Sequence, residues 1–201
     1  SFFSSDAIPT YRQVASVCGR LLWRQLMSRR PLCLFNDVVD VIRDIGRNRG
    51  ASRWDALFDG FTTQQRSVIR THLDRASENA YFNDQDVSAG ERKVVMACSD
   101  SSGAGYGYVV EGSHSVSKIW SPALLTAHIF IKEYIAAEEC LLSIMSRERR
   151  PCYIIIGIDN SAVARVLQQL YTGNSFVAAR LPALYESLRT SCTLIHVVSL
   201  R

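Results

Sequence analysis

The chain has 201 residues, of which 47% are hydrophobic, and a formal net charge of +4. That much apolar material suffices for a packed core and excludes wholesale disorder, whereas the mild positive charge permits contact with a polyanion but does not argue for one. No apolar run approaches the length of a membrane span. The six cysteines include no C-x-x-C pair, so we expect buried free thiols and a reducing, intracellular compartment. The two ends of the chain are typical of a segment cut from a longer polypeptide.

Apolar residues at three- and four-residue steps predict three helices in the first part of the chain. The first helix begins at Pro9 and stops at Pro31, and the other two cover about 35–45 and 64–79. Between the last two lie apolar side chains that we expect to pack back on the helices: Trp54, Leu57, Phe58 and Phe61. Residues 1–84 are therefore predicted to form a small all-helical unit.

The outer faces of these helices carry arginine, and no lysine precedes Lys93. Arginine suits bidentate contacts with phosphate. A solvated surface, or a bias in composition, explains the same pattern, so the arginines by themselves leave both interpretations open.

A polar stretch, NDQDVSAGER, follows this unit, and we place a linker in it at 85–92. Beyond it the pattern predicts strands at 93–99, 106–111, 115–120, 153–158 and 193–200, and helices at 127–145, 160–170 and 176–189. Pro182 is expected in the first turn of the last helix. Tight turns join the first three strands, and helices connect the last two. Residues 93–201 are therefore predicted to form an α/β domain with a mixed five-stranded sheet, three strands antiparallel and two parallel, flanked by helices.

Three acids occupy matching positions in this predicted domain. Asp100 ends the first strand, and Asp159 ends the fourth strand at the start of a helix. If these strands are neighbours, both carboxylates emerge at the same edge of the sheet. Glu133 lies beside the apolar stripe of the long helix, whereas Glu138 and Glu139 are expected on its solvated side. The alternative is an unrelated α/β domain, in which the two aspartates only form a turn and a cap.

Three carboxylates within a few ångströms repel one another and stay ionised together only if cations bind between them. Mg²⁺ takes oxygen ligands and keeps several waters, which suits carboxylates acting with a substrate phosphate. Two such ions about 3.5–4 Å apart can activate a water and stabilise the leaving oxygen of a phosphodiester. The predicted chemistry is phosphodiester hydrolysis.

The same residues carry a resemblance to a known family. Residues 100–107, DSSGAGYG, resemble the D-[AS]-S-x-x-G-[WY]-G opening of the ribonuclease H domains of reverse transcriptases. Residues 128–134, HIFIKEY, resemble the H-I-N-x-x-E-[LY] helix of these domains, most closely in DIRS-type retroelements and their VIPER-like relatives. Residues 158–160, IDN, resemble the [ST]-D-[NS] element. Upstream, residues 14–23 are similar to the helix that follows the polymerase palm, in the thumb or connection region.

This resemblance implies a ribonuclease H-like sheet and the hydrolysis of RNA paired to DNA, within a retroelement polyprotein. The residues that match the family's catalytic metal ligands are Asp100, Glu133 and Asp159, and they would hold two Mg²⁺ or Mn²⁺ ions. The residues that match positions near the substrate backbone or ribose are Ser101, Ser102 and Asn160. The implied partners are an RNA–DNA hybrid and either the polymerase domain of the polyprotein or another protein bound to the helical unit.

Two departures from the family favour a second hypothesis. Phe130 stands where the family has an asparagine that grips the hybrid. The family's fourth acid, which follows its last strand, is not reached before Arg201, so it either lies further along a longer chain or is lacking. These departures suit a weak or inactive binding module that kept the ribonuclease H fold. In that case the helical unit would matter more than the acids, as a protein-docking surface formed by Trp23, Trp54 and Phe58.

Overall fold

The computed structural model describes residues 8–27, 32–48, 53–77 and 92–200. The chain divides into two compact units, Ser1–Val87 and Ser88–Arg201. The predicted linker lies outside the described residues, except for Arg92. Among the described residues, no helix combines the length and the hydrophobicity needed to cross a membrane.

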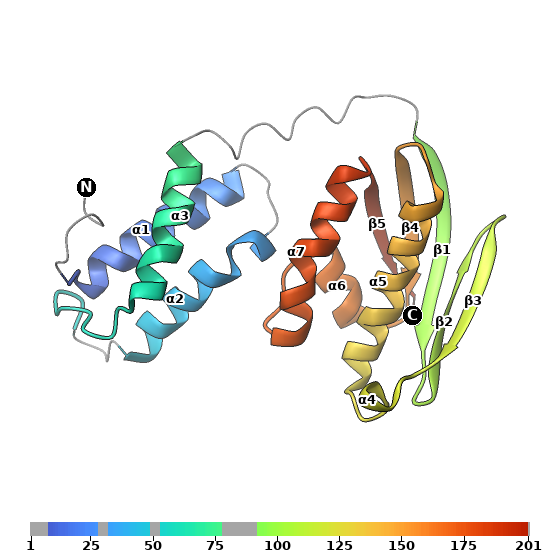
Figure 1. The fold of residues 1–201 in the computed structure, drawn as a ribbon, viewed down its shortest axis with the longest axis horizontal. Helices are drawn as coiled ribbons and strands as arrows, with labels where there is room; N and C mark the ends of the chain where they lie inside the picture. The colour runs from blue at the N-terminus through green and yellow to red at the C-terminus, as the bar shows by residue number, and fades with distance from the viewer. Residues whose placement is uncertain (1–7, 28–31, 49–52, 78–91, 201) are drawn as a thin grey trace. The chain divides into compact units, whose positions relative to one another are not determined.

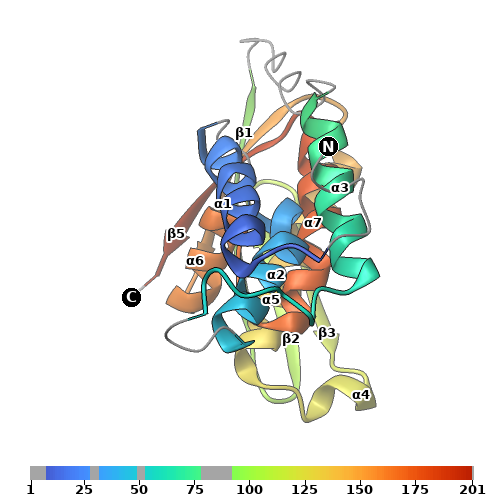
Figure 2. The same cartoon turned by 90° about the vertical axis from the view of Figure 1, so that its left-hand side faces the viewer.

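The first unit is helical, as the spacing of its apolar residues predicts. A short 3₁₀ turn precedes the second helix, and Figures 1 and 2 show the three longer helices packed together. The elements are α1 (Tyr11–Met27), η1 (Leu32–Phe35), α2 (Asn36–Asn48) and α3 (Thr63–Ser77). Their apolar faces meet in one cluster, whose most buried members are Val14, Cys18, Val38 and Ile69. The stretch before Pro31, where we expect the first helix to stop, lies outside the described residues.

The segment between α2 and α3 returns to the start of α1. The backbone N–H of Phe58 donates to the carbonyl of Pro9 at 2.7 Å, and the Phe58 ring stacks on Tyr11 with 4.5 Å between the ring centroids. The predicted packing holds for Phe58 and Phe61 but is wrong for Trp54 and Leu57, which are exposed. A backbone bridge, Thr10 to Leu57, pairs the two segments. Next to it the extended chain turns Leu57 outward and Phe58 inward, because successive residues of an extended chain point to opposite sides. Trp54 lies in the turn before this bridge.

The second unit is built on a five-stranded sheet in the order β3-β2-β1-β4-β5. Its β1–β2 and β2–β3 pairs are antiparallel, and its β1–β4 and β4–β5 pairs are parallel. The strands are β1 (Lys93–Ser101), β2 (Gly105–Val110), β3 (His114–Ile119), β4 (Cys152–Ile158) and β5 (Leu194–Ser199). This arrangement confirms the predicted mixed sheet of three antiparallel and two parallel strands.

Helices cover one face of this sheet, and Figure 1 shows α5, α6 and α7 on the same side of it. The helices are α4 (Pro122–Leu125), α5 (Ile129–Arg147), α6 (Ser161–Gln169) and α7 (Ser175–Thr190). The sequence did not predict α4, which is a single turn. It also misplaced Pro182, which lies inside α7 and not in its first turn. The side chain of Asn174, eight residues earlier, caps the start of this helix by accepting from the Val177 N–H.

The other face of the sheet is open in the described part of the chain. Along β1 the side chains of Val95 and Ala97 are buried under the helices, whereas Val94 and Met96 point to the open face and are about half exposed. A shallow apolar hollow of about 380 Å³ lies on this face. It is lined by Met96, Ala97, Cys98, Val109, Glu111, Ile155, Gly157, Val198 and Leu200.

The cysteines are free thiols, as predicted, but not all are buried. Burial raises the pKa of Cys18 and Cys140 to about 12, which keeps both thiols protonated at neutral pH. The expectation of burial is wrong for Cys98, which is exposed, and only partly right for Cys192. Cys98 alternates with the buried residues of β1 and therefore faces the open side of the sheet.

Candidate metal centre

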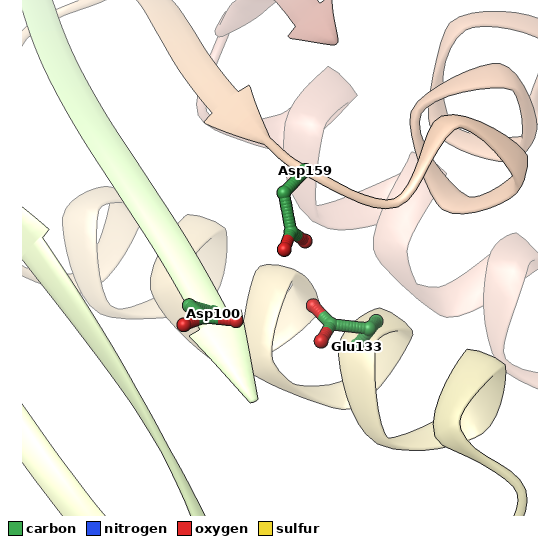
Figure 3. Close-up of side chains that lie close together, drawn as sticks. All are labelled: Asp100, Glu133 and Asp159. Carbon is green, nitrogen blue, oxygen red and sulfur yellow. The ribbon is translucent and has the colours of Figure 1, made fainter. Parts of the chain in front are cut away.

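Two of the three predicted acids leave neighbouring parallel strands at the same edge of the sheet. In the register of β1 and β4, Ser99 pairs with Ile158. The next residues, Asp100 and Asp159, therefore lie side by side, because residues that follow a registered pair in two parallel strands are neighbours. Figure 3 shows both carboxylates pointing into a common space.

The third acid, Glu133, reaches this space from α5. Figure 3 shows its carboxylate turned toward the two aspartates. One carboxylate oxygen from each residue lies within 4.8 Å of the others. Glu133 is 3% exposed, whereas Asp100 and Asp159 are exposed. The structure thus brings together three acids that lie 33 and 26 residues apart along the chain, at positions 100, 133 and 159.

Ser101 holds two of these carboxylates in place. Its backbone N–H donates to Asp100 Oδ1 at 2.7 Å and to Glu133 Oε1 at 3.2 Å, and its hydroxyl donates to Glu133 Oε1 at 2.9 Å. The second oxygen of the glutamate, Oε2, is buried and has no hydrogen-bond partner among the described residues. A buried acceptor without a donor is rare in proteins and suggests a ligand that the protein atoms do not supply.

The electrostatics of the three carboxylates also favour a bound cation. Burial raises the pKa of Glu133, the charges of Asp159 and Asp100 raise it further, and the hydrogen bonds from Ser101 offset part of this effect. Within the described ranges, no lysine, arginine or histidine forms an ion pair with any of the three acids. The repulsion is therefore not relieved by a cation of the described residues.

The donor set fits a divalent cation that prefers oxygen. Three carboxylates with partly solvated surroundings match the ligands that Mg²⁺ takes, and Mn²⁺ accepts the same set. The unpartnered Oε2 of Glu133 is a buried acceptor that such an ion could satisfy. Asp100, Glu133 and Asp159 could therefore hold a divalent metal ion.

The residues predicted to contact nucleic acid lie next to the acids, and each has a local structural role. The Ser102 hydroxyl accepts from the N–H groups of Ala104 and Gly105 at 3.3 and 3.2 Å and closes the turn after β1. Asn160 caps α6, and its side-chain oxygen accepts from two backbone N–H groups. The Ser101 hydroxyl is engaged by Glu133. A contact of these residues with nucleic acid stays a prediction.

The expectation of two solvated glutamates on α5 is wrong for Glu138. This side chain is 3% exposed, accepts from Arg180 Nε at 2.7 Å and accepts from the Tyr134 hydroxyl at 3.3 Å. Glu139 is only partly exposed and pairs with Lys118 at 2.6 Å. The cause is that α5 packs on the sheet and also on α7, so that its buried surface is wider than one stripe. The small residues Ala136 and Ala137 before these glutamates were the sequence signal for such close packing.

Sequence reasoning also missed Trp120, which borders the candidate centre. Its indole N–H donates to the carbonyl of Ser102 at 2.9 Å, and its ring stacks on Tyr106 at 4.5 Å. Trp120 is 4% exposed, although it follows an exposed strand. A tryptophan at the end of an otherwise polar strand was the available signal, because its N–H needs a partner when it is buried.

Comparison with solved structures finds ribonucleases H and reverse transcriptases, all at low identity. LC11 ribonuclease H1, solved in complex with an RNA/DNA hybrid, matches 53% of this chain and 84% of its own, with 10% identity and a TM-score of 0.40. Ribonuclease H1 of the halophilic archaeon Halobacterium salinarum matches 54% of this chain and 86% of its own, with 17% identity and a TM-score of 0.39. A foamy viral protease-reverse transcriptase, solved in complex with double-stranded DNA, matches 98% of this chain and 33% of its own, with 10% identity and a TM-score of 0.36.

A scan against protein-family models finds no match, and neither does a search of curated proteins. The five-stranded sheet of the second unit, with three antiparallel and two parallel strands and flanking helices, matches the ribonuclease H-like fold that the resemblance implies.

Proposed function

We propose that the second unit hydrolyses the RNA strand of RNA–DNA hybrids, using two Mg²⁺ or Mn²⁺ ions held by Asp100, Glu133 and Asp159. The observation that carries this proposal is the grouping of the three carboxylate oxygens within 4.8 Å, with no basic partner among the described residues. The match of these positions to the ribonuclease H motifs supports the same role.

Each acid has a distinct part in this proposal. Divalent ions bound there would activate a water on one side of the phosphodiester and stabilise the leaving oxygen on the other. Glu133 is the buried anchor, because Ser101 fixes one of its oxygens and leaves the other available as a ligand. Asp100 is oriented by the same backbone N–H. Asp159 is exposed at the end of β4, where a substrate phosphate can approach it.

The context that we propose is the ribonuclease H region of a retroelement reverse transcriptase, of the DIRS-type or VIPER-like kind. The helical unit would correspond to the thumb or connection segment and would contact the polymerase domain of the same polyprotein or another protein. Such a protein would work inside the cell, where its hybrid substrate is made. Ser101, Ser102 and Asn160 would lie along the hybrid beside the metal ions.

Phe130 supports a second candidate function, a module that binds a hybrid or a protein without cutting RNA. It lies in the first turn of α5, where its backbone N–H donates to Nδ1 of His128. An apolar ring there cannot make the amide hydrogen bonds that the matching asparagine would make to bases or sugars. This candidate predicts that Asp159→Ala leaves hybrid binding nearly unchanged.

The test is the cleavage of an end-labelled RNA–DNA hybrid by the full 201-residue chain in Mn²⁺ or Mg²⁺. We expect RNA products that disappear with a chelator and with Asp100→Asn, and no cleavage of the DNA strand. Asp55→Asn is the matched control, because Asp55 is an exposed acid of the other unit, paired with Arg12 at 2.7 Å. Products that persist in Asp100→Asn would refute the proposal. Hybrid binding without products would favour the second candidate.

A further inference from the structure

Lys132, the residue before Glu133 on α5, has a buried ammonium group. The residue is 4% exposed, and Nζ donates to the carbonyl oxygens of Gly103 at 3.1 Å and of Leu125 at 2.8 Å. It also lies 5.9 Å from the centroid of the Trp120 ring. No carboxylate pairs with it in the part of the chain that the structure describes. A buried ammonium is costly unless its donors are satisfied, so these contacts are specific features of the fold.

The turn that Lys132 contacts is held at three successive carbonyl groups. Trp120 donates its indole N–H to Ser102 at 2.9 Å and its backbone N–H to Ala104 at 3.0 Å. The carbonyl between them, that of Gly103, accepts from Lys132. The β1–β2 turn is therefore clamped between the end of β3 and the start of α5.

This clamp sits directly next to the candidate metal ligands. The clamped turn follows Asp100 and Ser101 without a break, and Ser101 donates hydrogen bonds to both Asp100 and Glu133. Lys132 adjoins Glu133 on the helix. A displacement of the turn relative to α5 would therefore change the distance between the two carboxylates.

We propose that Lys132 is a positioning residue for the metal centre: by holding the Gly103 carbonyl, it sets the separation of the Asp100 and Glu133 carboxylates that the ions require. This inference rests on the proposed metal-binding function. Lys132 touches neither metal nor substrate in this scheme. Groups that orient metal ligands from one contact away commonly contribute strongly to metal affinity.

The test is the affinity for Mn²⁺, measured by isothermal titration calorimetry on the full chain without substrate. Lys132→Met keeps the apolar stem and removes the ammonium, and we expect its dissociation constant for Mn²⁺ to rise by about 10- to 100-fold. Lys132→Arg keeps a charged donor at this position and should recover part of the loss. Lys93→Met is the matched control, because Lys93 pairs with Glu148 at 2.6 Å at the opposite end of β1 and should leave the affinity unchanged.

A role in stability alone predicts a different result. Lys132→Met would then lower the melting temperature while Mn²⁺ affinity stays at the wild-type value, and that outcome overturns the inference. If Lys132→Met does not fold, Trp120→Phe loosens the same turn by removing the indole donor to Ser102 and part of the ring beside Lys132, and an unchanged affinity there overturns the inference equally.

The readout also separates this inference from the proposed function. If the wild type binds Mn²⁺ through Asp100 but hydrolyses no hybrid, the proposed nuclease activity is refuted. The Mn²⁺ affinity of Lys132→Met then still decides whether Lys132 positions the metal ligands. Wild-type protein that binds no Mn²⁺ would refute both. If Lys132→Met needs a higher Mg²⁺ concentration than the wild type for cleavage, and its rate recovers at high Mg²⁺, both the inference and the proposed function are supported.

Discussion

The two units of this protein bury polar groups in different ways. The first unit packs around an apolar cluster, and its one buried polar residue among those described is His72, which pairs with Asp37 at 3.0 Å. The second unit buries Lys132, Glu133 and Glu138 on a single helix. Because burying charge opposes folding, its concentration in one element marks the part of the molecule that is shaped by function or by a specific network.

Two buried glutamates of α5 show the difference between burial for a functional site and burial within a polar network. Glu133 and Glu138 are each 3% exposed and lie five residues apart. Glu138 is neutralised by Arg180 and also accepts from Tyr134. Glu133 meets two more carboxylates and has an oxygen without a partner among the described residues. Burial alone therefore does not identify a site; a buried carboxylate whose balancing charge is missing among the described residues points to one.

The largest effect should come from neutralising the unbalanced glutamate. Glu133→Gln keeps the hydrogen bonds from Ser101 but removes a metal ligand's charge, and we expect hybrid cleavage to fall by about a thousandfold. The measurement is the single-turnover rate at saturating Mg²⁺. Glu186→Gln, which alters an exposed acid paired with Arg189, is the control and should keep the wild-type rate. A Glu133→Gln rate near that of the wild type would remove the distinction between the two glutamates.

The balanced glutamate should respond through stability. Arg180→Met leaves the buried carboxylate of Glu138 without its cation, and we expect the free energy of unfolding to fall by about 3 kcal/mol. Arg189→Met on the same helix breaks a pair in which both side chains are about half exposed, and should cost below about 1 kcal/mol. Urea denaturation of both variants checks the contrast. Equal losses would show that the burial of Glu138 carries no special cost.

The turn beside the candidate metal centre should be sensitive at one glycine and tolerant at another. A Cβ on Gly105 would lie 2.4 Å from the backbone oxygen of Lys118 on β3, whereas a Cβ on Gly103 meets nothing within 4 Å. Gly105→Ala should therefore destabilise the second unit by about 2 kcal/mol, because the backbone must shift. Gly103→Ala should be close to neutral. Thermal unfolding monitored by circular dichroism distinguishes them, and similar melting temperatures would contradict the close approach of the two strands.

The smallest effect should be an acid dependence of the first unit. Burial on its own raises the pKa of Asp37, but the hydrogen bond and charge of His72, with the Val38 N–H, outweigh it and lower the pKa. A lowered native pKa contributes stability above the unfolded value of about 4, and this stability is lost as the pH falls through the native value. Because the side chain is 49% exposed, we expect Asp37→Asn to cost below about 1 kcal/mol at neutral pH.

Amide hydrogen exchange of α2 and α3 at decreasing pH measures this contribution of Asp37 to stability. The Asp37→Asn protein should show a flatter decrease in protection than the wild type. Asp40→Asn is the control, since Asp40 forms an exposed pair with Arg43 at 2.7 Å. An identical pH dependence of all three proteins would show that the His72–Asp37 pair contributes nothing measurable to stability.

Much of the architecture was predictable because local patterns and global packing agree. Apolar runs in β1 and β4 predicted two strands, and the parallel register that the structure gives this pair brings Asp100 and Asp159 to one edge. Bounds differed by a few residues where pairing with a neighbour extended an element. For example, β1 continues to Ser101 because this residue pairs with Tyr106 across the turn.

The errors came from surfaces that a single stretch of sequence does not define. Helix α5 contacts the sheet on one side and α7 on another, so an amphipathic pattern underestimates its buried surface and misplaces Glu138. The predicted burial of Cys98 was wrong for the opposite reason. Its apolar neighbours suggested a buried strand, but the face of β1 that carries Cys98 is not covered by any described residues.

By itself, the order of the residues determined the types of the main elements, the mixed sheet and the three acids worth examining, because strand alternation, helix period and turn residues are local properties. Only the tertiary structure decided that the three carboxylates share one space, that Ser101 joins two of them, and that Glu138 is neutralised while Glu133 is not. Distances between side chains from remote segments depend on packing, and no local pattern specifies them.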